Sequence, residues 1–143
     1  MTIPAPLPGL IVSFSFLWSD EAASGATEGK KDRPCVLIAA YDTEQGTRAI
    51  LAPITHTPPR NANAAIALPP AIKAAIGLDD ADAWLVCAEL NITNWPGYDL
   101  RPAAGRPAGV YHYGMLPPGL YQGARQLAMR LYSAKQARAT SRL

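Results

Sequence analysis

Short apolar runs separated by turn-forming residues dominate the pattern along this chain. Residues 10–16 alternate between apolar and serine positions, which predicts a strand with one buried and one polar face. Residues 35–41 begin with an uninterrupted apolar run, which is typical of a central, buried strand. A turn at 42–46 suits a hairpin, and residues 48–54 form the expected return strand. Pro53 predicts an edge or a bend at the end of that return strand.

The second half of the chain predicts further short strands and two helices. A short strand is expected at 64–68. It is followed by a short helix at 69–77, because proline stands in its first turn and glycine just past its end. Residues 84–92 alternate most regularly and predict one continuous strand. A last short strand is expected at 110–113, and a longer helix begins at 117.

The C-terminal helix carries an apolar stripe with helical spacing, formed by Leu120, Ala124, Leu127, Ala128 and Leu131. Residues 1–8 are a proline-rich lead-in, 19–32 and 99–109 are loops, and 133–143 are a basic tail. Several short strands with one terminal helix predict a mainly β fold with helical decoration. A small, strongly bent β-barrel forming a single domain fits this order of elements.

Composition narrows the class of protein. Half of the 143 residues are hydrophobic and 17% are charged, which excludes disorder for the bulk of the chain. The net charge of +2 is too small to indicate nucleic-acid binding by itself. Cys35 and Cys87 lie inside apolar runs, so we expect buried, reduced thiols rather than disulfides or metal ligands. Neither a signal peptide nor a membrane span is apparent, so we expect a soluble, cytoplasmic protein. We also expect it to use no metal and no cofactor.

The candidate catalytic residues lie at two junctions between a strand and a loop. If 42–46 is the hairpin turn, the start of the first strand lies beside the end of the second, which predicts that Arg33 and Thr55 are neighbours. A guanidinium beside a hydroxyl is a good phosphate site, because arginine offers a planar fork of charged donors and the hydroxyl orients the ligand. The bland alternative is that Arg33 is only a solvated charge at the mouth of a strand.

Such a pair can support only some reactions. Arg33 stays protonated, so it is a poor general base, but it can stabilise charge that develops on a phosphorane. RNA carries its own nucleophile, the 2′-hydroxyl. A protein that aligns this oxygen with the phosphate needs neither a metal nor a strong side-chain nucleophile.

Three ordered segments resemble the MazF/PemK family of toxin endoribonucleases: PGLIVSF at 8–14, KDRPCVLI at 31–38 and APIT at 52–55. The resemblance covers residues 8 to 56 well, and the late strand and the C-terminal helix more loosely. It implies an SH3-like barrel that forms a homodimer and acts within a type II toxin–antitoxin pair. It also implies metal-independent cleavage of single-stranded RNA, such as mRNA, which leaves a 2′,3′-cyclic phosphate and a 5′-hydroxyl, and restraint by a cognate antitoxin protein.

Carried over by position, the resemblance implies that Arg33 is the catalytic arginine and Thr55 the catalytic hydroxyl residue, with 19–32 a mobile loop beside the RNA. The chain departs from the family pattern at His56, where many members have a small residue. It also departs in the late strand, where Glu89-Leu90-Asn91 replaces an acidic residue and glutamine. The insert 71–83 and the loop 95–109 are longer than usual. These differences leave both the RNA sequence specificity and the retention of activity open.

Other candidates have two interpretations each. His56 either shuttles a proton near the phosphate or makes a local hydrogen bond. Lys31 either steers phosphate or belongs to a solvated loop. Glu89 and Asn91 either contact RNA bases or form the solvent side of an amphipathic strand, and the solvent side is favoured. The alternative for the whole protein is a non-catalytic SH3-like module that binds a protein partner, such as a degenerate toxin or a topoisomerase-poison-like relative.

Overall fold

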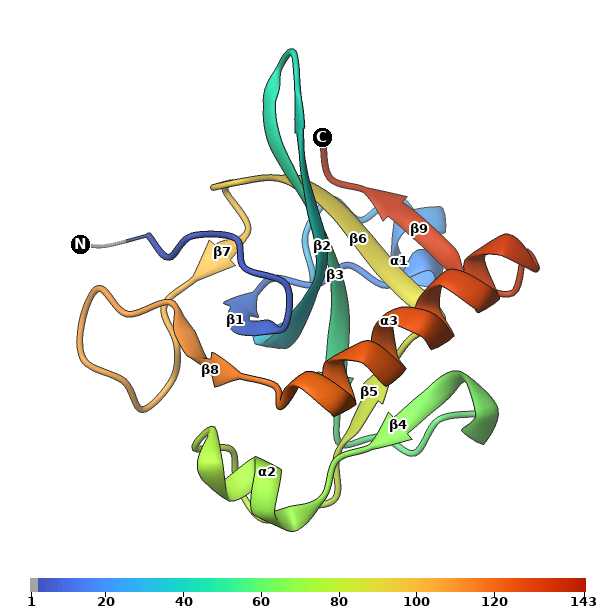
Figure 1. The fold of residues 1–143 in the computed structure, drawn as a ribbon. Coiled ribbons are helices and arrows are strands. Elements are labelled where there is room, and N and C mark those ends of the chain that lie inside the picture. The colour runs from blue at the N-terminus through green and yellow to red at the C-terminus, as the bar shows by residue number, and fades with distance from the viewer. Residues whose placement is uncertain (1–2) are drawn as a thin grey trace.

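The computed structural model describes residues 3–143, a mainly β arrangement with one long C-terminal helix (Figure 1). The strands are β1 Leu10–Phe14, β2 Arg33–Thr43, β3 Gly46–Thr55, β4 Ala65–Ala67, β5 Trp84–Val86, β6 Glu89–Asn94, β7 Leu100–Arg101, β8 His112–Met115 and β9 Arg138–Ser141. The helices are α1 Ser19–Ala23, α2 Pro70–Ala75 and α3 Pro118–Ser133, with a 3₁₀ turn, η1, at Ala62–Ala64. Met1 and Thr2 of the predicted lead-in lie outside the described residues.

The predicted hairpin is confirmed and forms the centre of the sheet. Strands β2 and β3 pair antiparallel from Thr43–Gly46 at the turn to Cys35–Pro53 at the other end. Gly46 has a φ of 107°, a conformation that glycine adopts without the steric cost of a Cβ atom. The prediction for Pro53 is confirmed as a bend, because β3 leaves β2 there and its last two residues pair with β5.

The nine strands found in residues 3–143 belong to one sheet, with β4-β5-β3-β2-β1-β7 as its longest path. Strand β6 pairs with β3, β8 pairs with β1, and β9 pairs in parallel with β6. No pairing within these residues joins the two ends of the sheet, so it is not closed. The prediction of a mainly β fold with a C-terminal helix is confirmed.

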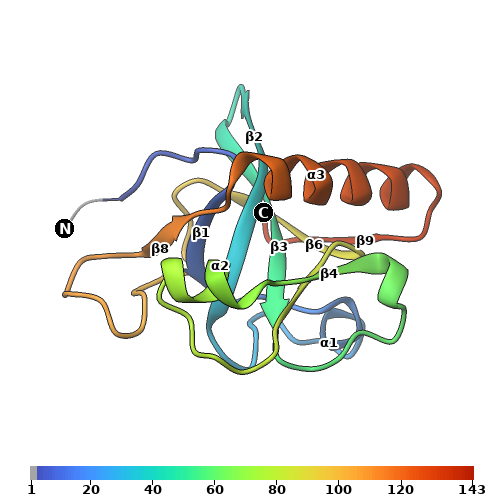
Figure 2. The same ribbon diagram turned by 60° about the horizontal axis from the view of Figure 1, so that its bottom comes forward.

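Two apolar cores lie on opposite faces of the central strands. Val36, Ile38 and Ala52 face the core that α3 covers, whereas Cys35 and Leu37 alternate with them and face the other core. Figure 2 shows α3 lying across the strands. Its predicted apolar stripe is confirmed, since its members are buried or packed against the core: Leu120, Ala124, Leu127, Ala128 and Leu131.

The prediction that the first strand has one polar face is wrong. Ser13 and Ser15 are each only 2% exposed. Strand β1 pairs with β2 along one edge and with β7 and β8 along the other, and both of its faces are covered. Small serine side chains fit such an interior, and the Ser15 hydroxyl accepts a hydrogen bond from the Gly29 N–H at 3.1 Å.

The predicted strand at 84–92 is two strands, and its expected solvent face is covered. Strand β5 ends at Val86 and pairs with β4 and the end of β3, whereas β6 starts at Glu89 and pairs with β3 and β9. Asn91 was expected on the solvent side, but it is 0% exposed, and Thr93, two residues later on the same face, is 2% exposed. Hydrogen bonds replace solvent for both side chains.

Three segments predicted as loop or tail contain regular structure. The loop 19–32 begins with α1, the loop 99–109 begins with β7, and the basic tail 133–143 contains β9. Each element is held by partners far away in the sequence, so local pattern does not reveal it. None of the helices described between residues 3 and 143 is both long and apolar enough to cross a membrane.

Candidate functional site

Arg33 begins β2 at the end of the hairpin opposite the turn. Its backbone pairs with Phe14 of β1, and it precedes Cys35 by two residues, so its side chain lies on the same face as these two buried residues. Burial lowers the pKa of Arg33, and the nearby Glu21 carboxylate partly opposes that effect. The group remains a cation at neutral pH.

Trp18 holds the Arg33 guanidinium. The Arg33 Cζ atom lies 5.2 Å from the centroid of the Trp18 ring, and that ring packs edge-on against Phe16 at 5.3 Å. A cation over an indole face is attracted by the negative charge density of the ring. Arg33 is therefore oriented by an aromatic surface instead of a carboxylate.

The Arg33 side chain has hydrogen-bonding capacity to spare. Its Nε atom is buried and has no hydrogen-bond partner within residues 3–143. A buried guanidinium N–H without an acceptor is costly, and it would be satisfied by a ligand with anionic oxygens. The site thus has the chemistry to bind a phosphate or a carboxylate.

Thr55 ends β3 and is nearly covered, at 8% exposure. Its Oγ1 atom accepts a hydrogen bond from the Thr57 N–H at 3.1 Å, which fixes the hydroxyl oxygen in a turn. The hydroxyl hydrogen remains able to donate to a second group. Thr55 therefore has the properties of an orienting donor at the base of a site.

Arg33 and Thr55 were predicted to be neighbours; they lie at the same end of the hairpin, but they do not pair across it and no hydrogen bond joins them. The ladder of paired residues between β2 and β3 ends at Cys35–Pro53. This last pair is two residues away from Arg33 on β2 and two residues away from Thr55 on β3. Beyond that pair, β2 continues beside β1 and β3 turns to β5, and both views show the strands separating there (Figures 1 and 2). A ligand between them would have to bridge the two strand ends.

His56 makes local contacts, which agrees with the second of its two interpretations. Its Nδ1 atom lies 2.8 Å from the Asp82 carbonyl oxygen, so Nδ1–H donates, and its Nε2 atom lies 3.4 Å from Asp79 Oδ2. The imidazole is 54% exposed. Both ring nitrogens face the turn before β5, so His56 anchors the segment after Thr55 to that turn.

Glu89 supports α1. Its Oε1 accepts from the Ser19 N–H at 2.8 Å, and its Oε2 accepts from the Ser19 hydroxyl at 2.6 Å. Within α1, Glu21 accepts from the Trp18 N–H at 3.1 Å, which is the helix-start contact expected of an acidic residue in this position. Glu89 thus positions the helix that brings Trp18 to Arg33.

Asn91 is wholly buried, so its side chain does not reach the surface to contact an RNA base. Its Oδ1 accepts from the Leu17 N–H at 2.9 Å and its Nδ2 donates to the Leu17 carbonyl at 2.8 Å. This pair of bonds imitates a strand pairing and fixes the chain just before Trp18. Asn91 and Glu89 therefore support the same segment from neighbouring positions of β6.

Sequence reasoning missed Arg142. Its side chain is 3% exposed, and its Nη2 atom lies 2.8 Å from Asp99 Oδ1. Its Nη1 donates to the Ser15 carbonyl at 2.7 Å and to Asn91 Oδ1 at 2.9 Å. The sequence pattern identified only a basic tail at 133–143, and no sequence signal distinguishes this arginine from its neighbours.

Contacts at Thr27, Gly29 and Asp32 hold the loop before Arg33, and other parts of the loop are exposed. The Arg142 Nη2 donates to the Thr27 carbonyl at 3.2 Å, and Asp32 lies 3.7 Å from Arg101 of β7. Lys31 is exposed, so it is available to an anionic ligand. Within residues 3–143 no three His, Cys, Asp or Glu side chains gather as metal ligands would.

The sequence matches no protein-family model and no curated protein. The described arrangement offers one fixed cation with an unused buried donor, one fixed hydroxyl and an exposed lysine. Each of these groups can contact an anion, and the arginine can stabilise added negative charge.

Proposed function

We propose that this protein is a MazF/PemK-like endoribonuclease, the toxin of a type II toxin–antitoxin pair, acting in the cytoplasm. In this proposal it cleaves single-stranded RNA without a metal, through attack of the 2′-hydroxyl on the neighbouring phosphorus. The products carry a 2′,3′-cyclic phosphate and a 5′-hydroxyl. The proposal combines the resemblance of residues 8–56 with the chemistry at the end of the hairpin.

The observation that carries the proposal is the buried, unpartnered Nε of Arg33. Trp18 orients the guanidinium while leaving its donors unused, unlike a carboxylate partner, which would occupy them. A phosphodiester supplies the missing acceptor, and its charge rises as the pentacoordinate intermediate forms. Donors already in place stabilise that charge without reorganisation at the moment of reaction.

Each group has a role in the proposed reaction. Arg33 stabilises the charged phosphorane, and the Thr55 hydroxyl donates to a phosphate oxygen and fixes its orientation. Lys31 attracts the backbone of the RNA. The 2′-hydroxyl oxygen forms the new bond to phosphorus, the bond to the 5′-oxygen breaks, and the proton passes from the first oxygen to the second, with water as the simplest carrier.

The barrel fold, the homodimer and the antitoxin belong to the same proposal. The mainly β sheet with its C-terminal helix would be an open form of the SH3-like barrel, and two copies would form a homodimer. A cognate antitoxin protein would restrain the activity by blocking access to the RNA.

A cleavage assay tests the proposal. Purified protein is incubated with a long single-stranded RNA in EDTA, and the fragment ends are identified by whether polynucleotide kinase labels them without prior phosphatase treatment. We expect discrete fragments with 5′-hydroxyl ends. Arg33→Ala is expected to lower the rate by a factor on the order of a hundred to a thousand, as for loss of one preorganised donor. Thr55→Ala is also expected to lower the cleavage rate.

The matched control is Arg125→Ala, which removes an exposed arginine from α3. It should cut at the wild-type rate. If Arg33→Ala and Arg125→Ala cut equally well, the nuclease is a contaminant or the site lies elsewhere, and the proposal fails.

The second candidate is a non-catalytic SH3-like protein-binding module. The departures at His56 and at Glu89 to Asn91 favour it, because the structure uses both segments for internal contacts. Intact RNA after incubation with folded protein, across several RNA sequences, would favour this module over the nuclease.

A further inference from the structure

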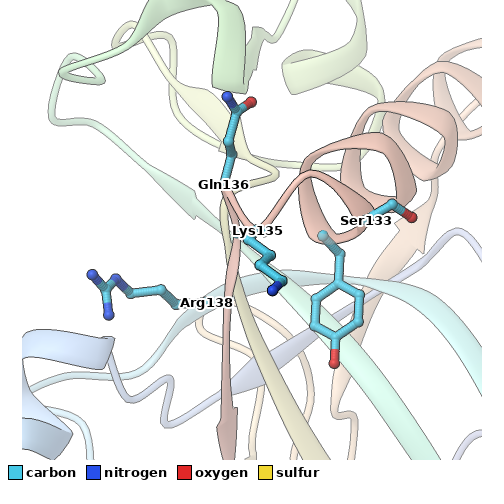
Figure 3. A pocket seen from close by; sticks show the side chains of 6 residues that line it. Ser133, Lys135, Gln136 and Arg138 are labelled. Atoms are coloured by element: carbon cyan, nitrogen blue, oxygen red, sulfur yellow. The ribbon is translucent and has the colours of Figure 1, made fainter.

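Lys73 of α2 is a buried lysine without a carboxylate partner. It is 3% exposed, and no aspartate or glutamate within residues 3–143 forms an ion pair with it. The other lysines of the chain are exposed. Lys135, for example, extends beside a shallow surface hollow of about 760 Å³ (Figure 3). Lysine is rarely buried unless other groups compensate for the loss of water around its amino group. The burial of Lys73 therefore indicates a specific use of that group inside the fold.

Backbone carbonyl groups of the loop after α2 take the place of a carboxylate. The Lys73 Nζ donates to the Ala81 carbonyl at 2.7 Å and to the Asp80 carbonyl at 3.2 Å. Asp79 Oδ1 accepts from the Ala81 N–H at 3.1 Å, which closes a turn within the same loop. Because two consecutive carbonyl groups point at one Nζ atom, the Lys73 side chain fixes the path of the chain through residues 79–82, the 79–82 loop.

The 79–82 loop also holds His56. The Asp82 carbonyl accepts from the His56 Nδ1–H at 2.8 Å, and Asp79 Oδ2 lies 3.4 Å from the His56 Nε2 atom. Asp79 therefore closes the turn of the loop with one carboxylate oxygen and faces the imidazole with the other. Both contacts of His56 depend on the shape of this loop, and hence on the group that fixes it.

Thr55 lies between the anchored His56 and a strand partner. Its backbone pairs with Trp84, which follows the 79–82 loop by two residues. Its Oγ1 accepts from the Thr57 N–H at 3.1 Å, so the position of the hydroxyl depends on the path of the chain on both sides of His56. Figure 2 shows the chain from α2 passing the end of β3 on its way to β5. A shift of the loop would therefore move the segment that carries the Thr55 hydroxyl.

We propose that Lys73 is a positioning residue for Thr55, acting through the 79–82 loop and His56. Lys73 does not contact the substrate in this proposal, because its Nζ is buried and directed at carbonyl groups. The insert 71–83 contains both Lys73 and the loop, so its extra length relative to the MazF/PemK pattern supports the site. This inference rests on the proposed function for the role of Thr55 in cleavage, whereas the link from Lys73 to His56 is testable without RNA.

Cleavage kinetics test the effect on the site. Lys73→Met keeps an unbranched, apolar side chain and removes the Nζ donors. We expect kcat to fall by about three- to tenfold with KM nearly unchanged, because the Thr55 hydroxyl is displaced while Arg33 still binds the phosphate. The double variant Lys73→Met with His56→Ala should be no slower than the slower single variant, because both changes break the same link.

Nuclear magnetic resonance of the histidine rings tests the link itself. The chain has two histidines, so His56→Ala assigns the signals of both rings. We expect the Nδ1 signal of wild-type His56 to show a bound proton, as the contact with the Asp82 carbonyl requires. Lys73→Met should shift the His56 signals toward those of a solvated ring. The matched control is Lys135→Met, the same substitution at an exposed lysine, which should change neither the signals nor the cleavage rate.

Thermal unfolding of each variant shows whether it is folded at the assay temperature. If Lys73→Met does not fold, Lys73→Gln, which keeps an N–H donor on a shorter side chain, takes its place in both tests. Unchanged His56 signals in the folded variant, or rate losses that multiply in the double variant, would overturn the inference. Changed His56 signals in a protein whose wild type leaves RNA intact would reject the nuclease and support the link from Lys73 to His56.

Discussion

Arg142, the penultimate residue, forms a buried ion pair with Asp99, with 2.8 Å between Nη2 and Oδ1. The arginine side chain is 3% exposed and the aspartate 15%. The same guanidinium contacts the Ser15 and Thr27 carbonyls and Asn91. The end of the chain is thus tied to the segments that lead into Trp18 and Arg33.

We predict that Arg142→Ala strongly destabilises the protein. The change leaves the Asp99 carboxylate and two carbonyl groups without their donor, and breaking a buried pair from one side costs about 3–5 kcal/mol. Urea unfolding at neutral pH measures the loss. The control is Arg138→Ala on the same strand, which should change the free energy of unfolding by less than about 0.5 kcal/mol. Equal losses of unfolding free energy in the two variants would contradict a stabilising role for the buried contacts of Arg142.

Trp18→Leu is expected to slow RNA cleavage without unfolding the protein. Loss of a cation–π contact of about 0.5–2 kcal/mol would leave Arg33 less well oriented, which corresponds to a rate loss of about two- to thirtyfold. Single-turnover cleavage rates measure the effect. Trp18→Phe keeps an aromatic face and should recover part of the rate, whereas a merely steric role would be filled equally well by leucine.

We expect His56→Ala to retain most of the cleavage activity. Both imidazole nitrogens face the segment 79–82, so the change should loosen the chain after Thr55 and lower the rate by less than about tenfold. The pH–rate profile decides between the two interpretations. If His56 shuttles a proton, the shape of the profile differs between the wild type and the variant. An unchanged profile supports the anchoring role.

The thiols should make stability fall at alkaline pH. Burial raises the pKa of Cys87 from an ordinary value of 9.0 to about 12, and burial also raises the pKa of Cys35. Above pH 9 the unfolded chain therefore loses thiol protons that the folded chain keeps. Each buried thiol lowers the free energy of unfolding by up to about 1.4 kcal/mol per pH unit in that range.

Urea unfolding between pH 8 and about pH 11 measures this slope, and Cys87→Ala should make it shallower. A thiol reagent should label neither cysteine until the protein unfolds, because the reactive form is the thiolate. Rapid labelling of the folded protein would contradict the burial of both groups.

Lys135→Gly should stabilise the protein. Removal of the Cβ atom relieves the left-handed strain at φ 60°, which is worth about 1 kcal/mol. Lys135→Ala is the matched control, since it removes the charge but keeps the Cβ atom, and it should leave the free energy of unfolding nearly unchanged. A loss of stability in the glycine variant would show that the lysine side chain itself stabilises the turn.

The sequence by itself determined the elements whose signals are local. The apolar run after Arg33, the turn and the return strand predict the hairpin, and helical spacing predicts α3. Antiparallel pairing then brings Arg33 and Thr55 to the same end of that hairpin. These inferences need only the period of the side chains and the chemistry of turns.

The tertiary structure decided what depends on distant partners. Asn91 alternates with apolar residues as a solvent-facing residue would, but Leu17 and Arg142 satisfy its amide in the interior. The tail becomes a strand because β6 offers it an edge, and not because its own residues favour one. Trp18 meets Arg33 at the start of a helix that Glu89, seventy residues away from Ser19, holds in place. Burial and pairing between segments far apart in the chain leave no local period, so sequence alone does not reveal them.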